Sequence, residues 1–437
     1  MSTSLKHKKI LIIGMGRSGL SAFHRLQNEG CEKLWGFDDK SKNQTNILDT
    51  TEALNILPQI DLCILSPGIP STHTLVEKAK SFHIPIWGEL ELGFYFFPKN
   101  IPIIAITGSN GKTTTVLLLE NILKKMGKNI FVGGNIGTPL CELSSDTAAK
   151  LDYVVLENSS FQLETIQSYH PRIAACVSFS FTHGERYKSE KEYAQAKLNI
   201  LKNMTEEDLF IFKATPEFVQ ELREVKTYVR LCSLPATTEL QKQFNLKNFK
   251  MKGIHNIENL QVVWEILKRL SLTDTQIAEQ KEIAMQTLID TFAGVSHRTE
   301  FVTKHDGFAV YNDSKSTNWD STIKAIQSFE TEEAPLYLLL GGKKRGLHDE
   351  ITEHLKYFKK VEKIFLRGEI AQALKEELGE KKNCEIIESF AQLRKKLRVE
   401  KFTGVLLFSP AFPSFDLYKN YEERGDDFKK SFLKDVP

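Results

Sequence analysis

The sequence predicts an α/β protein of three domains, each built around a parallel β-sheet covered by helices. Short apolar runs alternate with helical segments along the whole chain, which is the pattern of such sheets. The 437 residues are enough for three domains of ~150 residues each. Unusual polar residues follow several of the apolar runs. Ligand groups in open α/β sheets collect at the carboxyl ends of strands, so these residues are candidate site residues.

The composition is that of an ordinary globular protein. Hydrophobic residues make up 41% of the chain, charged residues 26%, and the formal net charge of +2 argues against a surface that coats nucleic acid. The six scattered cysteines form no C-x-x-C pair, so we expect reduced core thiols and a cytoplasmic protein. No run approaches the ~18 apolar residues of a membrane span, so we expect no membrane insertion.

The first domain is expected over residues 1–98. A strand at 9–13 leads into residues 14–19, a G-x-G-x-x-G turn that opens a helix. A second strand ends at Asp38, about where a dinucleotide-binding fold places its ribose-binding acid. A third strand leads into Ser-Pro-Gly at 66–68. These features predict half of a Rossmann-like fold.

Residues 107–115, T-G-S-N-G-K-T-T-T, form a shortened phosphate-binding loop between a buried strand at 103–106 and a helix at 116–126. The loop lacks the first glycine of the usual pattern. Its backbone N–H groups and the positive helix end attract an anion, and Lys112 adds a full charge. The Thr113 hydroxyl can ligate the Mg²⁺ that accompanies a nucleotide. The sequence therefore predicts a nucleoside triphosphate site.

The central domain, expected over residues 99–294, holds three further candidates. Glu157 directly follows a buried strand, where a carboxylate can hold Mg²⁺ against phosphates or, alternatively, begin a helix. His183 also follows a strand, and alone it is more often an ordinary loop residue. Lys197 lies in a mostly apolar helical stripe. Such a lysine more commonly extends its ammonium to solvent, and the alternative is a depressed pKa that permits chemical modification.

The C-terminal domain, expected over residues 295–437, repeats the alternation. Its strands are expected at 308–311, 336–340, 363–366 and 404–408. A polar run follows the first of them, in which Asp313 and Lys315 could meet a nucleotide bound by the neighbouring domain, with a capped helix start as the alternative. A hydroxyl-rich loop follows the last.

In series, these motifs resemble those of the Mur ligase family, ATP-dependent amino-acid ligases of peptidoglycan precursor synthesis. The motifs are T-G-S-N-G-K-T-T (107–114), G-G-N-I-G (133–137), E-N-S-S-F-Q-L (157–163), His183 with Arg186-Tyr187, A-K (196–197), G-I-H-N-I-E-N (253–259), S-H-R (296–298), N-D-S-K-S-T-N (312–318), L-L-G-G (339–342) and S-P-A (409–411). Ten motifs in order are specific. The first domain and the segment at 414–425 resemble the branch that adds D-glutamate to UDP-N-acetylmuramoyl-L-alanine through an acyl phosphate.

The resemblance implies roles for individual residues. ATP would be bound by Gly108, Ser109, Asn110, Gly111, Lys112, Thr113, Thr114, Asn256, Asn259, Arg298, Asp313 and Lys315. One or two Mg²⁺ ions would be held at Thr113, Glu157, His183 and Lys197, the last in carbamylated form. The UDP-linked substrate would be bound by Gly14, Gly16, Arg17, Ser18, Gly19, Asp38, Asp39, Ser66, Pro67, Gly68, Asn135 and Ser159, and D-glutamate by Thr317, Arg345, Ser414 and Phe415. Lys112, His183, Lys197 and Lys315 would be catalytic. We expect a monomer whose partners are these small molecules.

The sequence departs from the family pattern at three places. Asn158 stands where a leucine is usual and Thr182 where an aspartate is usual, and residues 341–346 read G-G-K-K-R-G in place of G-G-D-G-K-G. Arg345 would replace the lysine that clamps the carboxylate of the amino acid.

Four alternatives stay open at this point. They are a sister ligase that adds another amino acid, a folylpolyglutamate synthetase, a non-catalytic nucleotide-binding regulator, and an NAD-dependent dehydrogenase suggested by residues 14–19 and Asp38. The dehydrogenase alternative leaves Lys112 and Glu157 unexplained.

Overall fold

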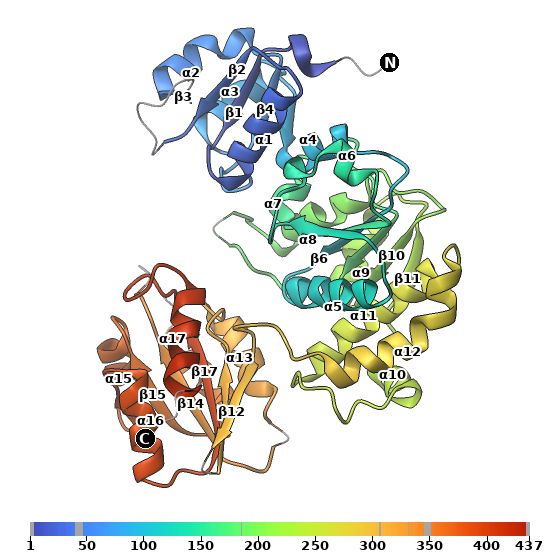
Figure 1. Cartoon of the computed structure of the whole chain (residues 1–437). Coiled ribbons are helices and arrows are strands. Elements are labelled where there is room, and N and C mark those ends of the chain that lie inside the picture. Colours follow the sequence, from blue (N-terminus) through green and yellow to red (C-terminus); the bar gives the residue numbers. More distant parts are fainter. Residues whose placement is uncertain are drawn as a thin grey trace. The chain divides into compact units, whose positions relative to one another are not determined.

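A computed structural model describes residues 4–39, 47–184, 186–305, 307–330, 332–344 and 351–433. Its three β-sheets are flanked by helices (Figure 1), which confirms the predicted α/β class. The strands of the three sheets fall within residues 10–88, 103–233 and 300–411, one sheet in each block expected from the sequence. By compactness the chain divides into two units. The first comprises Met1–Leu240 and Glu258–Leu288 and holds two sheets; the second comprises Gln241–Ile257 and Ile289–Pro437 and holds the third.

The N-terminal sheet is parallel, in the order β3-β2-β1-β4-β5. Its elements are β1 (Ile10–Ile13), α1 (Arg17–Asn28), β2 (Leu34–Phe37), β3 (Ile47–Leu48), α2 (Thr50–Ile56), β4 (Leu62–Leu65), α3 (Thr74–Ser81), β5 (Ile86–Gly88) and α4 (Glu89–Phe96). Helices α1 and α4 cover one face, and α2 and α3 cover the other. The strand order reverses between β1 and β4, and ligands of such sheets bind in the crevice at this point.

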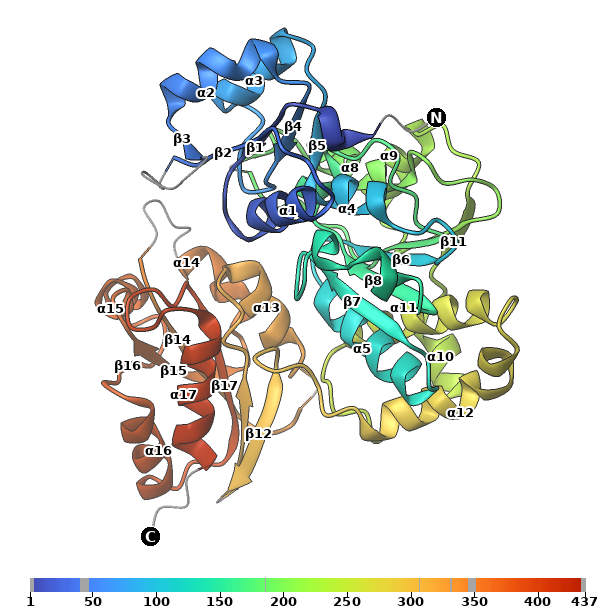
Figure 2. The same cartoon turned by 45° about the horizontal axis from the view of Figure 1, so that its top comes forward.

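The central sheet is also parallel, in the order β11-β10-β9-β6-β8-β7. Its strands are β6 (Ile103–Thr107), β7 (Ile130–Gly134), β8 (Tyr153–Glu157), β9 (Ile173–Cys176), β10 (Leu209–Phe212) and β11 (Arg230–Ser233). The helices of this part are α5 (Lys112–Lys125), α6 (Ser145–Ala148), α7 (Ser160–Leu163), α8 (Glu190–Leu198), α9 (Pro216–Glu224), α10 (Thr237–Gln243), α11 (Ile254–Leu270) and α12 (Thr275–Thr291). Helix α5 runs along β7 and β8 (Figure 2). All of β6, β8 and β9 is buried, which explains their continuous apolar sequences.

The C-terminal sheet is mixed, in the order β12-β13-β17-β14-β15-β16. Its elements are β12 (Glu300–His305), β13 (Phe308–Asn312), α13 (Trp319–Gln327), β14 (Leu336–Gly341), α14 (Ile351–His354), β15 (Val361–Arg367), α15 (Ala371–Leu378), β16 (Cys384–Ile386), α16 (Phe390–Val399), β17 (Gly404–Ala411) and α17 (Tyr421–Leu433). The expectation of a wholly parallel sheet is wrong for β12, which runs antiparallel to β13. Only two residues separate these strands, and a parallel pair would need a crossover of a dozen or more.

Helix α5 begins at Lys112, a turn earlier than the start predicted at 116. Helix α11 begins at Ile254, and α8 ends at Leu198, before a short 3-10 turn. Ser189 caps α8 by accepting from Glu192 N, and the Glu192 carboxylate accepts from Lys188 N.

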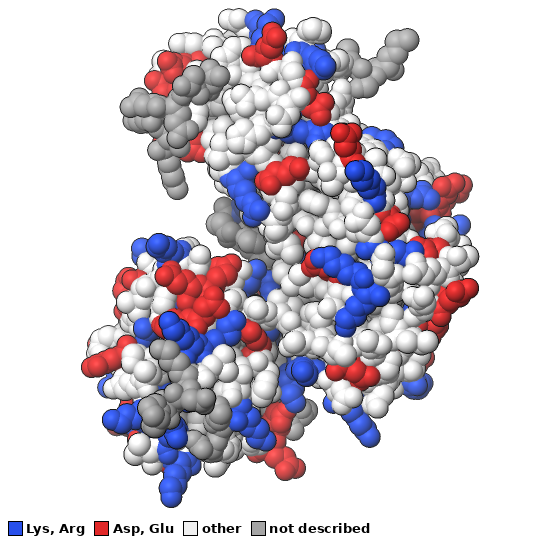
Figure 3. Space-filling view, viewed as in Figure 1, with Lys and Arg blue, Asp and Glu red and all other residues white. Residues whose placement is uncertain are grey.

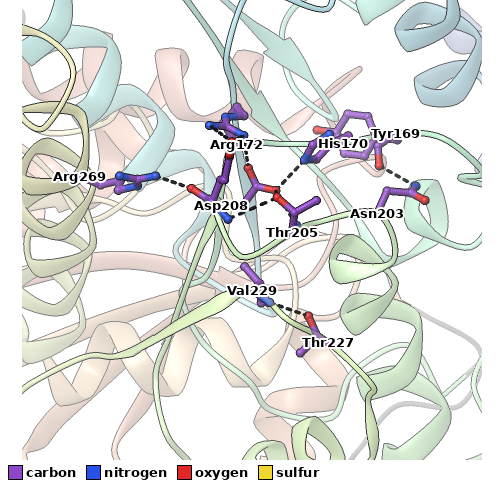
Figure 4. Close-up of polar contacts among 10 residues, drawn as sticks. Tyr169, His170, Arg172, Asn203, Thr205, Asp208, Thr227, Val229 and Arg269 are labelled. Carbon is purple, nitrogen blue, oxygen red and sulfur yellow. Dashed lines mark hydrogen bonds and ion pairs between the residues drawn. The ribbon is translucent and has the colours of Figure 1, made fainter.

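Buried Asp208 organises the amino ends of β9 and β10 (Figure 4). Its carboxylate lies 2.6 Å from His170 Nε2, accepts from Thr205 N at 2.7 Å, and pairs with Arg172 at 2.9 Å. Burial alone would raise the pKa of Asp208, but the hydrogen bonds from His170 and Thr205 outweigh it, and the pKa is lowered. This network stabilises the sheet at the edge opposite to the carboxyl ends of its strands.

The surface and the thiols agree with the composition. On the face shown in Figure 3, Lys and Arg side chains are interspersed with Asp and Glu side chains. All six cysteines are free, four of them buried and two half-buried. Across the described ranges, no helix combines the length and the apolar character that a membrane crossing requires.

Candidate active site

The phosphate loop begins where β6 ends and is held in shape by the segment after β9. Ser109 N donates to Ser178 O and Asn110 N to Ser178 Oγ, both at 2.9 Å. Gly111 caps α5 in the left-handed region at φ +84°, and an added Cβ would lie 2.6 Å from Asn259 Oδ1. A glycine is therefore required at this position. The result is a preformed anion-binding turn at the N-terminus of a helix.

Lys112, Thr113 and Glu157 meet at this loop. Lys112 Nζ donates to Gly108 O at 2.7 Å and to Ser109 O at 3.1 Å. Thr113 Oγ1 donates to Glu157 Oε2 at 2.7 Å, and the other carboxylate oxygen accepts from the side chain of Asn135 at 2.9 Å. Four residues predicted from three motifs thus lie at one point, where the adjacent strands β6 and β8 end.

The pair of Thr113 and Glu157 fits a magnesium ion. Both supply hard oxygen ligands, and neighbouring ligands of an octahedral Mg²⁺ lie about 2.9 Å apart at its usual bond lengths. The observed 2.7 Å between their oxygens is close to that spacing. Within the described ranges, no three His, Cys, Asp or Glu side chains gather as a possible metal site. Mg²⁺ commonly uses one or two carboxylates together with substrate phosphates, so a smaller protein donor set suits it.

Lys197 lies beside the same loop, with only 2% of its surface exposed. Its Nζ donates to Gly108 O at 3.0 Å and lies 4.4 Å from the centre of the Tyr193 ring. Burial lowers the pKa of Lys197 to about 8, although the charge of a Cys176 thiolate would act in the opposite direction. Of the two alternatives left open for this lysine, extension to solvent is excluded, because its helix packs the whole side chain into the domain core.

His183 belongs to an aromatic cluster next to Lys197. Its backbone is in the left-handed region at φ +65°. The ring packs edge-on against Phe161, with centroids 4.9 Å apart, and lies 6.3 Å from Tyr193, the ring beneath Lys197. The structure therefore connects His183 to Lys197 through Tyr193.

The three candidate segments of the N-terminal domain also meet. An added Cβ at Gly19 would lie 1.9 Å from Gly14 O, so the start of α1 packs directly on the turn. Ser66 Oγ donates to the same carbonyl at 2.6 Å, and Met15 N donates to the Asp38 carboxylate at 2.8 Å. These groups lie at the carboxyl ends of β1, β2 and β4, at the reversal of strand order.

Other predicted residues of the first unit have local roles. Asp39 is exposed and pairs with His73 at 3.6 Å. Ser159 caps α7 and donates to Gln162 Oε1 at 3.0 Å. Asn259 accepts from Thr115 Oγ1 at 3.3 Å, one turn into α5.

In the second unit, Asp313 joins the ends of β13 and β17. It is buried and accepts from Ser316 Oγ at 2.5 Å and from Ser409 Oγ at 2.7 Å. Burial raises the pKa of Asp313 to about 6, while these hydrogen bonds and the charge of Arg298 act in the opposite direction. Lys315 Nζ lies 4.9 Å from the centre of the Tyr421 ring. The two polar loops predicted after these strands are thus in contact.

The remaining predicted residues are less informative. Asn256 donates to Lys252 O at 2.7 Å. Ser414 is buried, Thr317 is half-buried and Phe415 is exposed. Arg345 lies outside the described residues.

Sequence reasoning missed the residues that hold these loops in place. Arg424 is buried and donates to Ser314 O at 2.7 Å and to Phe412 O at 3.0 Å, which ties α17 to two strand-end loops. Ser178 holds the phosphate loop in the same way. The sequence did not indicate these contacts, because Ser314 and Asn110 lie far along the chain from Arg424 and Ser178.

A phosphate loop on a parallel sheet, next to a Rossmann-like sheet, defines a nucleotide-binding α/β protein. Residues 106–271 match the Mur ligase middle domain, and residues 297–412 match the Mur ligase glutamate ligase domain. The chain belongs to the Mur ligase family.

Individual relatives match along nearly the whole length. The chain is 35% identical over 432 residues to the UDP-N-acetylmuramoylalanine--D-glutamate ligase of Aquifex aeolicus (strain VF5), covering 97% of this chain and 98% of that protein. It is 33% identical to the protein of the same name from Caldanaerobacter subterraneus subsp. tengcongensis, covering 98% and 99%. Among solved structures, the MurF ligase of Thermotoga maritima in complex with ADP has a TM-score of 0.57 at 15% identity, covering 98% and 96%.

Proposed function

We propose that this chain is an ATP-dependent ligase that joins D-glutamate to UDP-N-acetylmuramoyl-L-alanine in the cytoplasm, as a step of peptidoglycan precursor synthesis. The reaction type is supported by one observation above all, the meeting of Lys112, Thr113, Glu157 and buried Lys197 at the phosphate loop. The substrates are supported by the names of relatives that match the chain from end to end. We expect the working form to be a monomer.

The reaction activates a carboxylate. An oxygen of the L-alanine carboxylate attacks the γ-phosphorus of ATP in line, the bond to the β-phosphate oxygen breaks, and ADP leaves. The amine of D-glutamate then attacks the acyl carbon, a proton is lost, and phosphate departs as the amide forms. The loop N–H groups and Lys112 hold the phosphates and neutralise their charge, which is most of what a protein contributes to phosphoryl transfer.

Thr113 and Glu157 would hold Mg²⁺, which supplies further charge neutralisation at the phosphates. We assign His183 to the metal side of the site, since its ring lies in the cluster that includes Tyr193. We further propose that Lys197 is carbamylated. The neutral amine would attack carbon dioxide and lose a proton, which converts a buried cation into a carboxylate-like group.

The other predicted residues would bind the substrates. The turn at 14–19, Asp38, Asp39 and the loop at 66–68 would hold the uridine diphosphate, with Asn135 and Ser159 nearer the reacting end. Asn256, Asn259, Arg298, Asp313 and Lys315 would contact the nucleotide, and Thr317, Ser414 and Phe415 would surround D-glutamate. Membership of the Mur ligase family excludes the dehydrogenase alternative, and a sister ligase remains the competing proposal.

The test is phosphate release from ATP with UDP-N-acetylmuramoyl-L-alanine and one amino acid at a time. We expect release with D-glutamate and little with L-glutamate or L-alanine. Release with L-alanine alone would show that the chain is a sister ligase. The reaction without any acceptor measures background hydrolysis and is the control.

A further inference from the structure

Arg186 makes an unusually complete set of contacts for a loop residue. Its Nε donates to Glu164 Oε1 at 3.0 Å and one terminal nitrogen to Glu164 Oε2 at 2.6 Å, which is a bidentate ion pair. The other terminal nitrogen donates to Pro67 O at 2.9 Å and to Ile69 O at 3.3 Å. The side chain is only 10% exposed.

The two carbonyls belong to the loop that follows β4 in the N-terminal sheet. Pro67 and Ile69 flank Gly68, and Ser66 at the start of this loop donates to Gly14 O. Ile69 also lies against Gly14, since an added Cβ there would come within 2.8 Å of its side chain. Arg186 thus contacts the strand-end loop that supports the turn at residues 14–19.

The other contacts of Arg186 lie in the central domain. Glu164 ends α7, whose first residues follow Glu157, and it also accepts from Tyr187 OH at 2.6 Å. The guanidinium lies 4.3 Å from the centre of the Phe161 ring, the ring against which His183 packs. The backbone N–H of Arg186 donates to His183 O at 2.9 Å.

We propose that Arg186 is a positioning residue that fixes the loop at 66–70 relative to α7 and the His183 turn, and so sets the span available to the UDP-linked acceptor. This inference rests on the proposed function. An acceptor that is held at its uridine end by the N-terminal loops must present its carboxylate near Glu157. The distance between these two anchor points, the N-terminal loops and Glu157, therefore decides whether the carboxylate reaches the phosphate loop. A misplacement of about 1 Å can cost ~100-fold in rate.

The geometry predicts a specific kinetic signature for Arg186→Lys. Lysine keeps the charge but cannot form the bidentate pair and reach two carbonyls at once. We expect the KM for UDP-N-acetylmuramoyl-L-alanine to rise at least about tenfold, with a fall in kcat. The KM for ATP and the Kd for UDP alone, measured by calorimetry, should change less than about twofold, because neither ligand spans both anchor points.

Two further variants make the test specific. Glu164→Gln keeps the side-chain volume and the Tyr187 contact, so the KM for UDP-N-acetylmuramoyl-L-alanine should rise less than in Arg186→Lys. The effects of the two substitutions should not add in the double variant, because both alter the same ion pair. Arg172→Lys alters another arginine–carboxylate pair of the central domain and should leave all constants unchanged.

The outcomes separate the two proposals. If the wild type turns over this acceptor but both Arg186→Lys and Glu164→Gln keep its KM, the positioning role is refuted while the proposed function stands. A fall in kcat with every KM unchanged indicates a purely structural role and also refutes the inference. If the wild type does not turn over this acceptor, the proposed function fails and the inference falls with it. Should Arg186→Lys not fold, Glu164→Gln decides alone.

Discussion

The burial of Lys197 favours its neutral amine form more than exposure to solvent would. Its Nζ is enclosed by the Gly108 carbonyl and the Tyr193 ring, with Cys176 nearby, and burial lowers its pKa to about 8. A lowered pKa means that the neutral form, the form that reacts with carbon dioxide, becomes dominant as pH rises through about 8. The burial was not predictable from the helical stripe alone, because a snorkelling lysine has the same sequence pattern.

We therefore expect Lys197→Ala to lose activity about 10- to 100-fold or more, since the carbamate that we propose at the metal site can no longer form. Added short carboxylic acids such as acetate should restore part of the activity. Lys202→Ala, on the exposed turn after α8, is the matched control and should retain activity and show no rescue. Intact-protein mass should show one added carbon dioxide on the wild type but not on Lys197→Ala. Absence of both rescue and mass increase would contradict the carbamate.

At the residue scale, strand ends were the useful signal. The sequence predicted three site features, Glu157, Asp313 and the phosphate loop, because each follows a continuous apolar run. In the structure each lies in a candidate site at the carboxyl end of a strand. Arg186 and Arg424 carried no such signal. Their importance comes from contacts with the carbonyls of Pro67 and Ser314, which are distant along the chain and which only the fold brings close.

At the scale of elements, the start of α1 depends on one close approach. The position of Gly19 leaves no room for a Cβ, which would lie 1.9 Å from Gly14 O. Gly16, three residues earlier, has extended backbone and no atom within 4 Å of an added Cβ. The two glycines of one motif thus have different structural requirements.

Gly19→Ala should therefore destabilise the N-terminal sheet by about 1–3 kcal/mol, because the backbone must shift to relieve the clash. It should also weaken binding of UDP, measured by calorimetry. Gly16→Ala is the matched control and should leave the melting temperature nearly unchanged. Equal effects on the melting temperature would contradict the packing described for α1.

Helix α4 carries a buried carboxylate between two sheets of the first unit. Its Leu92 packs in the core of the N-terminal sheet, and its Leu90 and Phe94 pack in that of the central sheet. Glu89 accepts from Cys141 N at 2.7 Å, and burial raises its pKa from 4.5 to about 7. Between these values the folded protein keeps a proton that the unfolded chain has released, so stability falls as pH rises through this window.

Glu89→Gln should remove this pH dependence, because the amide keeps the acceptor oxygen and has no charge to bury. The wild type should lose up to about 3 kcal/mol of unfolding free energy between pH 4.5 and 7 that the variant does not lose. Urea unfolding at several pH values measures the difference. Glu77→Gln, on the exposed side of α3, should behave like the wild type. If the unfolding free energy of Glu89→Gln depends on pH as that of the wild type does, Glu89 is not the group responsible.

The success or failure of each strand prediction has a physical cause. Parallel strands buried on both faces have continuous apolar sequences, so the strands predicted at 103–106 and 336–340 match β6 and β14 nearly to the residue. β12 was not predicted, because an edge strand with one neighbour tolerates polar residues such as Glu300 and Lys304.

At the scale of the whole molecule, three sheets bring the predicted motifs to strand ends in the manner of α/β proteins. Motif order along the chain was sufficient to indicate the family, and full-length relatives confirm it. Amino-acid specificity was the least predictable property, since the departure at 343–345 includes Arg345, which lies outside the described residues.

The central claim is that the phosphate loop activates a carboxylate. It is tested most directly with UDP-N-acetylmuramoyl-L-alanine labelled with oxygen-18 in its carboxylate, incubated with ATP, Mg²⁺ and D-glutamate. An acyl phosphate requires that one labelled oxygen leave with the released phosphate, and mass spectrometry of that phosphate should detect it. Formation of the amide with unlabelled phosphate, or release of phosphate with no amide product, would contradict the account.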